Sequence, residues 1–445
     1  MDRRRYAFVG VGSRSRFYMN ALMGSYAERS AIVGICDSNQ HRAKLAAAKV
    51  ESSGASCSPV CYSPEGFVEM LRREKVDTVI VTSIDRTHHQ YILSALEMGC
   101  EVICEKPLTM TEGRVQALLE ATNKYGRHVT VTFNYRFSPR NAALAAAIRS
   151  GAIGEVQSVH FEWVLDTRHG ADYFRRWHRD RANSGGLMVH KASHHMDLAS
   201  WWVGSRPERV FGFGGLRFYG RENAERRGIR RIGFRGTGHV GDPFAIDLAS
   251  DPDMRELYLE AEGEDGYLRD QGVFSDGITI EDDMAVLVRY RSGATMSYHL
   301  TAYGPWEGYR VSVNGTRGRL ELEVVETAAT IGRDGEEIGP EPPSPGFEIN
   351  EVPGPQEGTS LWWRPLWRPP VSLKVPEGGG GHGGGDPKLL ETLFGDAPAD
   401  PMGFRADEID GAYAALTGIA ANRSFVTGSA IALTDLVPGA LLEDW

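Results

Sequence analysis

The segment 101–108 places an acid and a lysine where proteins commonly do chemistry. Residues 101–104 are typical of a strand in a parallel sheet, and Pro107 ends it because proline donates no backbone hydrogen bond. Glu105 and Lys106 then lie at the strand's carboxyl end, the edge at which α/β sheets bind ligands. A partly desolvated lysine at this edge has a lowered pKa and can exchange a proton with a hydroxyl group. The alternative is a surface salt bridge at a strand end.

A second candidate set lies in the segment 190–197, where His190 and His194 are four residues apart. On a helix the two imidazoles share one face with Asp197, which is one turn further on. Imidazoles titrate near neutral pH and can relay protons, and a histidine pair with a carboxylate can also bind zinc or manganese. Neighbouring lysines such as Lys191 argue against a bound cation, so we expect no metal.

Basic and aromatic residues precede these histidines, and we expect them in a loop at the cleft. Arginine binds carboxylate, phosphate or sulfonate groups, and tryptophan stacks on the apolar face of a sugar ring. The same composition fits the phosphates of a cofactor or a solvated, salt-bridged face, and the glycine-rich run 378–386 predicts a further loop over a substrate. The candidates for substrate contact are Arg136, Arg176, Trp177, His178, Lys191 and His382. For Lys191 and His195, the simpler interpretation is that they face solvent or cap carbonyl groups.

The first strand-like run has the pattern of a dinucleotide-binding turn. Residues 5–11 are mostly apolar and lead into a glycine turn, after which a helix is predicted. Glycines let the backbone approach a pyrophosphate, and the helix N-terminus attracts its charge. Asp37 follows a second apolar run, where its carboxylate can accept hydrogen bonds from a ribose and repel a 2′-phosphate, so NAD is expected and NADP is the less favoured alternative. The turn residues assigned to the cofactor are Gly10, Gly12, Ser13 and Arg14.

Composition bounds the class of protein. Of 445 residues, 41% are hydrophobic and 24% charged, as in soluble globular proteins, and the length predicts two domains. A net charge of −10 argues against a nucleic-acid binder, because phosphate contacts require a basic surface. No apolar run is long enough to span a membrane. Five cysteines without the spacing of a metal or disulfide site indicate reduced thiols in a cytoplasmic protein.

Strand-like and helix-like segments alternate in the first part of the chain, which predicts an α/β fold with a doubly wound parallel sheet. We assign residues 1–127 to a Rossmann dinucleotide-binding domain and residues 128–445 to an α+β domain for substrate binding and oligomerisation. Alternating runs with hairpin turns predict that the second domain has an open, largely antiparallel sheet. Two insertions, 217–280 and 326–386, are expected to be long loops over the cleft.

These motifs together resemble the Gfo/Idh/MocA family of nicotinamide-dependent oxidoreductases, most of which act on sugars, glycosides and cyclitols. The resemblance runs through most of the chain in the family's order, at Gly10 and Gly12, Asp37, Ser83 to His88, Cys104 to Leu108, Asn134 to Phe137 with Pro139, Ile153 to Val156, and Ser184 to Gly186 leading to His194 and Asp197. Two departures from the family pattern lie in the first domain: Ser15 stands at the third glycine, and Ile84 stands where a proline is usual.

The resemblance implies roles for individual residues. Lys106 and His194 correspond to the family's catalytic set, and His190 stands where that set commonly has an aspartate. The cofactor contacts implied beyond the glycine turn and Asp37 are Ser83, His88, Glu105, Lys106 and Asn134. The family uses the uncovered face of its second sheet for subunit contacts, which implies a homodimer or homotetramer.

Three functions follow from this resemblance. The main expectation is hydride transfer between NAD and a ring hydroxyl of a small carbohydrate, with Lys106 taking the hydroxyl proton. The alternative is an NAD-dependent glycosidase that acts on a neutral or anionic glycoside by transient oxidation, elimination, water addition and re-reduction. The additional histidines of the chain would supply the bases for this reaction. A minor alternative is a regulator that binds NAD and sugar without catalysis, although Lys106 and His194 are both present.

Overall fold

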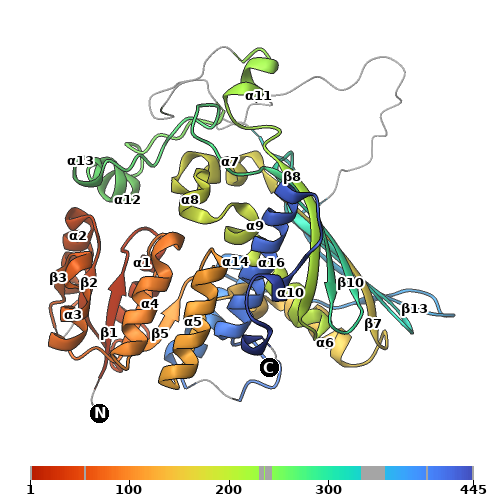
Figure 1. Ribbon diagram of the computed structural model, residues 1–445, viewed down its shortest axis with the longest axis horizontal. Coiled ribbons are helices and arrows are strands. Elements are labelled where there is room, and N and C mark those ends of the chain that lie inside the picture. Colours follow the sequence, from red (N-terminus) through yellow and green to blue (C-terminus); the bar gives the residue numbers. More distant parts are fainter. Residues whose placement is uncertain are drawn as a thin grey trace.

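Two open sheets with helices packed against them make up the computed structural model (Figure 1). The structure describes residues 3–54, 57–229, 235, 243–331, 356–396 and 399–442. It confirms the predicted architecture, a Rossmann domain followed by a domain with a mostly antiparallel sheet.

The N-terminal sheet is parallel throughout, in the order β3-β2-β1-β4-β5-β6. Its strands are β1 (Arg4–Val9), β2 (Ser30–Cys36), β3 (Val60–Tyr62), β4 (Thr78–Val81), β5 (Glu101–Cys104) and β6 (Val129–Val131). The helices between them are α1 (Ser15–Met23), α2 (Gln40–Ser52), α3 (Phe67–Arg73), α4 (His88–Glu97) and α5 (Glu112–Tyr125). The strand order reverses between β1 and β4, and such a switch point is where open α/β sheets bind their ligands.

The second sheet has the order β14-β13-β12-β11-β7-β10-β9-β8-β15, and every neighbouring pair is antiparallel except β7 with β10. Its strands are β7 (Val156–Asp166), β8 (Pro207–Gly215), β9 (Asp283–Tyr290), β10 (Thr295–Gly304), β11 (Glu307–Gly315), β12 (Gly318–Thr327), β13 (Gly358–Pro365), β14 (Val371–Leu373) and β15 (Ile431–Ala432). Buried and exposed residues alternate along β9 and β10, so one face of the sheet is covered and the other is open.

The helices of the second domain are α6 (Pro139–Arg149), α7 (Thr167–Arg175), α8 (Arg181–Ser184), α9 (Leu187–His190), α10 (Ser193–Val203), α11 (Arg221–Arg226), α12 (Pro252–Met254), α13 (Glu262–Asp265), α14 (Gly381–Gly384), α15 (Asp386–Phe394) and α16 (Glu408–Thr427). Of these, α6, α7 and α16 pack against the second sheet, whereas α12 and α13 lie beside the first domain (Figure 1). A π-helical turn, η5 (Arg255–Leu259), joins α12 to the residues before α13.

Parts of the predicted loops are ordered elements. The insertion 326–386 contains β13 and β14, which extend the sheet beyond β12, and the insertion 217–280 contains α11, α12 and α13. The basic segment expected as a loop is partly the helix α7. Asp166 caps this helix because its carboxylate accepts hydrogen bonds from the backbone N–H groups of residues 168 and 169.

The helix expected to carry both candidate histidines is interrupted. His190 is the last residue of α9, and α10 begins only at Ser193. His190 and His194 therefore do not share one helical face with Asp197, as the four-residue spacing predicted. The break lets the two imidazoles approach the same space from different directions.

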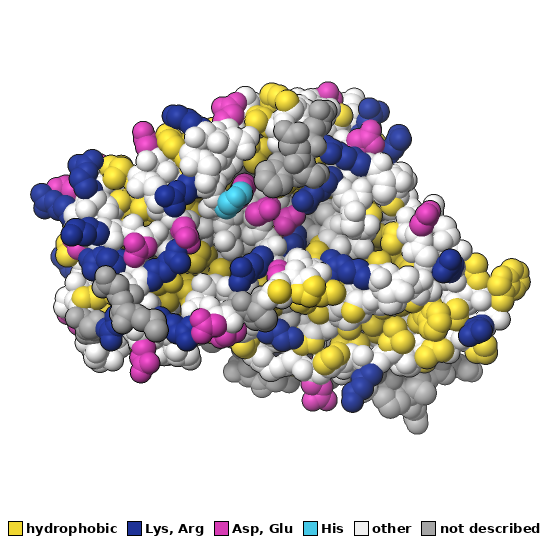
Figure 2. Space-filling view, turned by 90° about the horizontal axis from the view of Figure 1, so that it is seen from below, with side chains coloured by type: hydrophobic (Ala, Val, Ile, Leu, Met, Phe, Trp, Pro, Cys, Tyr) yellow, Lys and Arg dark blue, Asp and Glu magenta, His cyan; other side chains and the backbone are white. Residues whose placement is uncertain are grey.

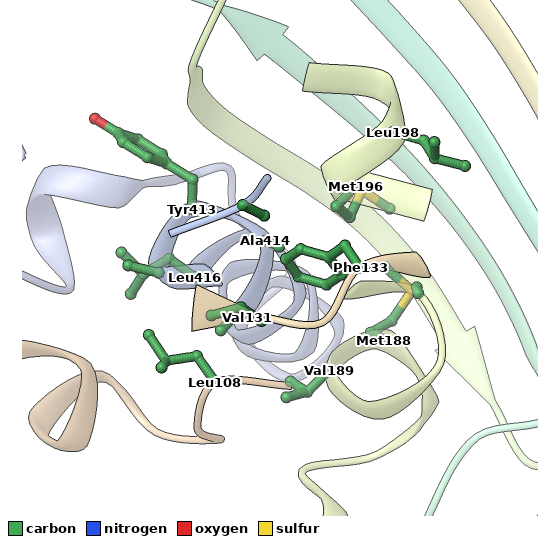
Figure 3. Packing of buried hydrophobic residues seen from close by; sticks show 14 of the residues in the cluster. Leu108, Val131, Phe133, Met188, Val189, Met196, Leu198, Tyr413, Ala414 and Leu416 are labelled. Carbon is green, nitrogen blue, oxygen red and sulfur yellow. The ribbon is translucent and has the colours of Figure 1, made fainter. Parts of the chain in front are cut away.

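The helix α16 runs between the two domains and packs against both (Figure 3). Two of its glycines make this close packing geometrically feasible. A Cβ atom on Gly411 would lie 2.9 Å from side-chain atoms of Leu108 and Val131, and one on Gly418 would lie 2.3 Å from the carbonyl oxygen of Met188. The helix thereby fixes the segment after β5 against the segment that contains α9.

Substituting Gly418→Ala should destabilise the protein. Alanine favours a helix over glycine by about 1 kcal/mol, but overpacking against the Met188 backbone should cost about 1–3 kcal/mol. Gly113→Ala in α5 is the matched control, because nothing lies within 4 Å of its added methyl group. Thermal unfolding should show a lower midpoint for Gly418→Ala and an unchanged or higher one for Gly113→Ala. Equal midpoints for Gly418→Ala and the parent would contradict the packing argument.

Candidate active site

A cavity of about 750 Å³ follows the carboxyl edge of β1, β4 and β5. Every residue predicted to contact the cofactor lines it: Gly10, Gly12, Ser13, Arg14, Asp37, Ser83, His88, Glu105, Lys106 and Asn134. We call this space the dinucleotide cavity. A second cavity of about 890 Å³, the substrate cavity, lies on the side of the second sheet, and its lining includes Tyr135, Arg140, Lys191, Glu307 and Glu326. Lys106, Tyr173, His194 and His382 line both cavities and so mark their junction.

The glycine turn brings the backbone close to the end of β4. Gly10 has φ +79°, and a Cβ atom there would lie 2.4 Å from Cα of Ser83, so only glycine fits. Asp37 is held at the end of β2 by the backbone N–H groups of Val11 at 2.7 Å and Asn39 at 2.8 Å. Burial raises the pKa of Asp37, while the nearby guanidinium of Arg42 opposes that rise.

These residues fit a dinucleotide. The glycines leave room for a diphosphate beside the helix α1, and the Asp37 carboxylate lies on the wall where an adenosine ribose would be held. Near the junction, Asn134 Oδ1 is buried and has no hydrogen-bond partner within the described residues. An amide group of a ligand would satisfy this acceptor.

Glu105 belongs to the frame of the dinucleotide cavity. Its carboxylate accepts hydrogen bonds from Arg14 Nε at 2.5 Å and from the Tyr18 hydroxyl at 2.7 Å. Burial would raise the pKa of Glu105, but Arg14 and Lys106 outweigh it and the pKa lies below its usual value. An ionised Glu105 thus ties the glycine turn to the strand end that carries Lys106.

The side chain of Lys106 begins a chain of three buried groups. Its Nζ lies 3.2 Å from Nε2 of His190, and Nδ1 of His190 lies 2.6 Å from Oδ2 of Asp85. Burial and the Lys106 charge lower the pKa of His190 well below its usual value, so the ring is neutral. Its one proton is best placed on Nδ1, where it donates to Asp85, and Nε2 then accepts a hydrogen bond from Lys106.

This environment tunes Lys106 as a base. Burial lowers the pKa of Lys106 to about 8, and the opposing charges of Asp85 and Glu105 limit the fall. Burial also raises the pKa of Asp85, and the positive charge of Lys106 opposes this rise. A lysine with a pKa of about 8 is partly a free amine near neutral pH and can take a proton from a hydroxyl group.

His194 is the second polar group at the junction. Its ring packs edge-on against Tyr135, with ring centroids 4.8 Å apart, and its Nδ1 is buried without a hydrogen-bond partner in the described chain. Burial and the charges of Lys106 and Lys191 lower the pKa of His194 well below its usual value. A neutral imidazole with an unused nitrogen can accept or donate one hydrogen bond to a ligand.

The glycine-rich loop reaches the junction from α14. His382 Nδ1 lies 3.0 Å from Oδ2 of Asp386, and Asp386 Oδ1 accepts a hydrogen bond of 2.8 Å from Nδ2 of Asn134. His382 lines both cavities, and Asp386 links it to Asn134.

Three predictions about individual residues are corrected by their surroundings. Arg136 lines neither cavity. Its guanidinium binds Asp197 at 2.5 and 2.8 Å and also pairs with Asp410, so it is structural rather than a substrate ligand.

His195 does not face solvent. It is fully buried, its ring stacks on Trp163 with centroids 4.0 Å apart, and it forms a hydrogen bond with the Tyr298 hydroxyl.

Lys191 does not face solvent either. It is buried, and its Nζ lies 5.0 Å from the ring centroid of Trp163 at the wall of the substrate cavity. Its position agrees with the expectation of a substrate contact and contradicts the solvent-facing interpretation.

The other predicted substrate residues lie on the cofactor side. Arg176, Trp177 and His178 line the dinucleotide cavity and not the substrate cavity. Arg176 pairs with Asp172 at 2.8 Å. His178 stacks on Trp177 and meets the His190 ring edge to face. This basic segment therefore faces the dinucleotide cavity, with Arg176 held in an ion pair.

Sequence reasoning missed Asp85 and Tyr258. Asp85 lies in the loop after β4, which ends at Val81, and an acid so close to a strand's carboxyl end was the available signal. Tyr258 comes from the insertion 217–280 and contacts the glycine turn, which no local pattern indicates. Across the described part of the chain, no three His, Cys, Asp or Glu side chains are grouped to hold a metal ion, and no helix there is long and apolar enough to cross a membrane.

Two family models match the chain. One is described as the oxidoreductase family's NAD-binding Rossmann fold and covers residues 4–133; the other is its C-terminal alpha/beta domain and covers residues 145–433. The protein therefore belongs to the Gfo/Idh/MocA family of oxidoreductases, as its motifs indicated.

Relatives of this chain include oxidoreductases with and without a stated substrate. YteT of Bacillus subtilis, named as an oxidoreductase, is 34% identical over 441 residues, which are 96% of this chain and 97% of YteT. The D-glucoside 3-dehydrogenase of Escherichia coli is 27% identical over 173 residues, 39% of this chain and 46% of that enzyme. The WlbA dehydrogenase of Bordetella pertussis, solved with NADH and UDP-GlcNAcA, shares the fold with a TM-score of 0.62 at 18% identity, over 97% of this chain and 98% of that one.

The Lys106, His190 and Asp85 chain predicts a pH dependence. Oxidation of a hydroxyl substrate should quicken as the pH rises and Lys106 becomes a free amine, with the midpoint at about 8. Replacing Asp85→Asn removes a negative charge that raises the pKa of Lys106, so the rising limb should move to lower pH. The rate of NADH formation on the enzyme, followed across pH, measures both. A rising limb that Asp85→Asn leaves in place would contradict the coupling.

Proposed function

We propose that this protein transfers a hydride between NAD and a ring hydroxyl of a sugar, glycoside or cyclitol. The observation that carries the proposal is the position of Lys106. Its tuned amine lies at the junction of a cavity that fits a dinucleotide and a polar cavity large enough for a sugar ring.

In this reaction Lys106 accepts the proton of the substrate hydroxyl, while NAD, when bound, accepts the hydride from the same carbon. His190 accepts a hydrogen bond from Lys106 and keeps its amine directed at the junction. Asp85 holds His190 in the tautomer that makes this bond. His194 orients the hydroxyl or passes a proton outward through its unused nitrogen.

NAD is favoured over NADP by the charges at the ribose end of the cavity. Asp37 would accept hydrogen bonds from ribose hydroxyls and would repel a 2′-phosphate. Arg42, whose charge acts on Asp37, is paired with Asp265, and its Nε is 3.7 Å from Asp37. It is therefore neutralised on both sides and poorly placed to bind an additional phosphate.

The substrate cavity favours a polyhydroxyl compound. Acids and bases alternate on its wall: Glu307 bonds His169 at 2.7 Å, and Arg140 pairs with Glu326 at 3.2 Å. Hydroxyl groups both donate and accept, so they match such a mixed wall. Lys191 would be the contact for a carboxylate if the substrate is anionic.

The glycosidase alternative has fewer bases than the sequence suggested. His195 is buried away from both cavities, and the His190 imidazole is bonded to Asp85 and Lys106. Of the surplus histidines, His194 and His382 remain at the junction. A simple dehydrogenase needs no more bases than these.

Lys106→Ala should lower the rate at which bound NADH forms by about two to four orders of magnitude, the usual contribution of general acid–base catalysis. NADH affinity should change little, because the glycine turn and Asp37 remain. Lys44→Ala, an exposed lysine of α2, serves as the control and should match the parent. Full activity of Lys106→Ala would exclude Lys106 as the base.

A panel of free sugars, glycosides and cyclitols, each supplied with NAD, tests the proposed reaction. We expect at least one molecule of NADH to form per protein chain, with the glycosidic bond of the substrate intact. Release of aglycone without accumulated NADH would establish the glycosidase instead. NADH binding without turnover of any compound would support the regulator.

We also infer that a second copy of the chain covers the open face of the second sheet, giving a homodimer or homotetramer. On that face Phe213 is 67% exposed and Leu287 is 57% exposed. Figure 2 shows hydrophobic side chains gathered at the end of the molecule that the second sheet forms. Burying such side chains against a partner would be favourable.

Leu287→Glu should reduce the mass measured in solution by light scattering to that of one chain, because a charge would be buried in the interface. Val68→Glu, a partly exposed residue of α3 in the first domain, should leave the mass unchanged. A parent protein that already has the mass of one chain would contradict the inference.

A further inference from the structure

The insertion of the second domain reaches back onto the first. We call residues 251–267 the insert segment; it contains α12, η5 and α13. Figure 1 shows α12 and α13 above α2, at the edge of the N-terminal domain and away from the sheet of their own domain. Tyr258, Asp265 and Tyr267 of this segment line the dinucleotide cavity. The segment is therefore a wall of that cavity that the Rossmann domain does not itself supply.

The closest contact is with the glycine turn. The Tyr258 hydroxyl accepts a hydrogen bond of 2.9 Å from the backbone N–H of Ser13, and it lies 2.8 Å from Ser13 Oγ. A Cβ atom on Gly12 would lie 3.3 Å from the same hydroxyl. This phenol is thus at the place where the backbone of the turn would bind a diphosphate.

Further contacts hold the insert segment along α1 and α2. Arg16 pairs with Asp253 at 2.6 Å, and Arg42 pairs with Asp265. The backbone N–H of His41 donates to Glu264 Oε2 at 2.9 Å. Arginines of the first domain thus neutralise Asp253 and Asp265, so the charge of these two acids does not simply repel a dinucleotide.

The other side of the insert segment is fixed to the second domain. Within the insertion, Tyr258 packs in a small apolar cluster with Leu248 and Leu257, and the guanidinium of Arg269 lies 5.7 Å from its ring centroid. Two residues beyond the segment, Arg269 pairs with Asp172 of α7 at 2.7 Å. The segment is consequently anchored at both domains and spans the space between them.

We propose that the insert segment retains the bound dinucleotide, and that the Tyr258 hydroxyl donates a hydrogen bond to its diphosphate. The proposal rests on the dinucleotide-binding role proposed above. Departure of the cofactor past this wall requires the Tyr258 contact to break together with the ion pairs at Arg16 and Arg42. Cofactor release is then slow compared with hydride transfer, and the first NADH formed stays on the protein.

The test is the rate of NADH release from the full-length protein. Protein loaded with NADH is mixed with a large excess of NAD, and the loss of bound-NADH fluorescence is followed. Tyr258→Phe, which keeps the ring and its packing, should release NADH about tenfold faster or more, as loss of a charge-assisted hydrogen bond predicts. The control is Tyr303→Phe, which removes a hydroxyl bonded to Asp283 on the second sheet and should release NADH at the parent rate.

The proposal would be overturned if Tyr258→Phe released NADH at the parent rate. It would also be overturned if this variant bound NADH more tightly and faster, because Tyr258 would then obstruct NADH binding. Parent release as fast as hydride transfer would also overturn it. In each of these cases the protein still binds NADH, so the proposed function stands. Absence of NADH binding by the parent would overturn the proposed function and the retaining role together.

Discussion

The site depends on close packing between α16 and both domains. Gly411 and Gly418 lie about two turns apart on this helix, and each lets a neighbouring segment approach closer than a methyl group would permit. One of these segments follows Lys106 and the other contains α9, which ends in His190 (Figure 3). The bond of 3.2 Å between Lys106 and His190 crosses the domain boundary, so its length is set by this packing.

The electrostatics of the site follow from the same enclosure. Burial lowers the pKa of Lys106 to about 8, and without Asp85 and Glu105 it would fall further. The carboxylate that the family commonly has at position 190 is replaced here by the imidazole of His190. A carboxylate, that of Asp85, instead bonds the ring nitrogen of His190 that does not face Lys106. The arrangement keeps a negative charge near the lysine while a neutral ring makes the direct contact. It explains how a departure from the family pattern remains compatible with proton transfer.

Much of the fold could be predicted from local pattern. The helix α5 is an example, because residues 112–125 have apolar residues at helical spacing and Gly126 supplies the left-handed residue that ends the helix. The strands β13 and β14 could not be predicted, since β13 is supported by its pairing with β12, and β14 by its pairing with β13. The interruption between His190 and His194 was missed for a similar reason: spacing alone indicates one helix, whereas tertiary contacts shape this segment.

The candidate site shows the same division. Residues at strand ends, such as Lys106 and Asp37, were found because a parallel sheet gathers its strand ends at one edge. Arg136 was misassigned because a motif does not show that Asp197 and Asp410 neutralise its charge. Contacts made by the insertion, above all Tyr258 on Ser13, depend on how a distant segment folds back, which the sequence does not encode locally.

A crystal structure of the protein with NAD bound most directly tests the proposal that a dinucleotide and a carbohydrate meet at Lys106. We predict the adenosine ribose on Asp37, the diphosphate at the glycine turn, and the nicotinamide ring at the junction beside Lys106 and His194. Electron density for the nicotinamide away from Lys106, or for the cofactor in the substrate cavity, would contradict it.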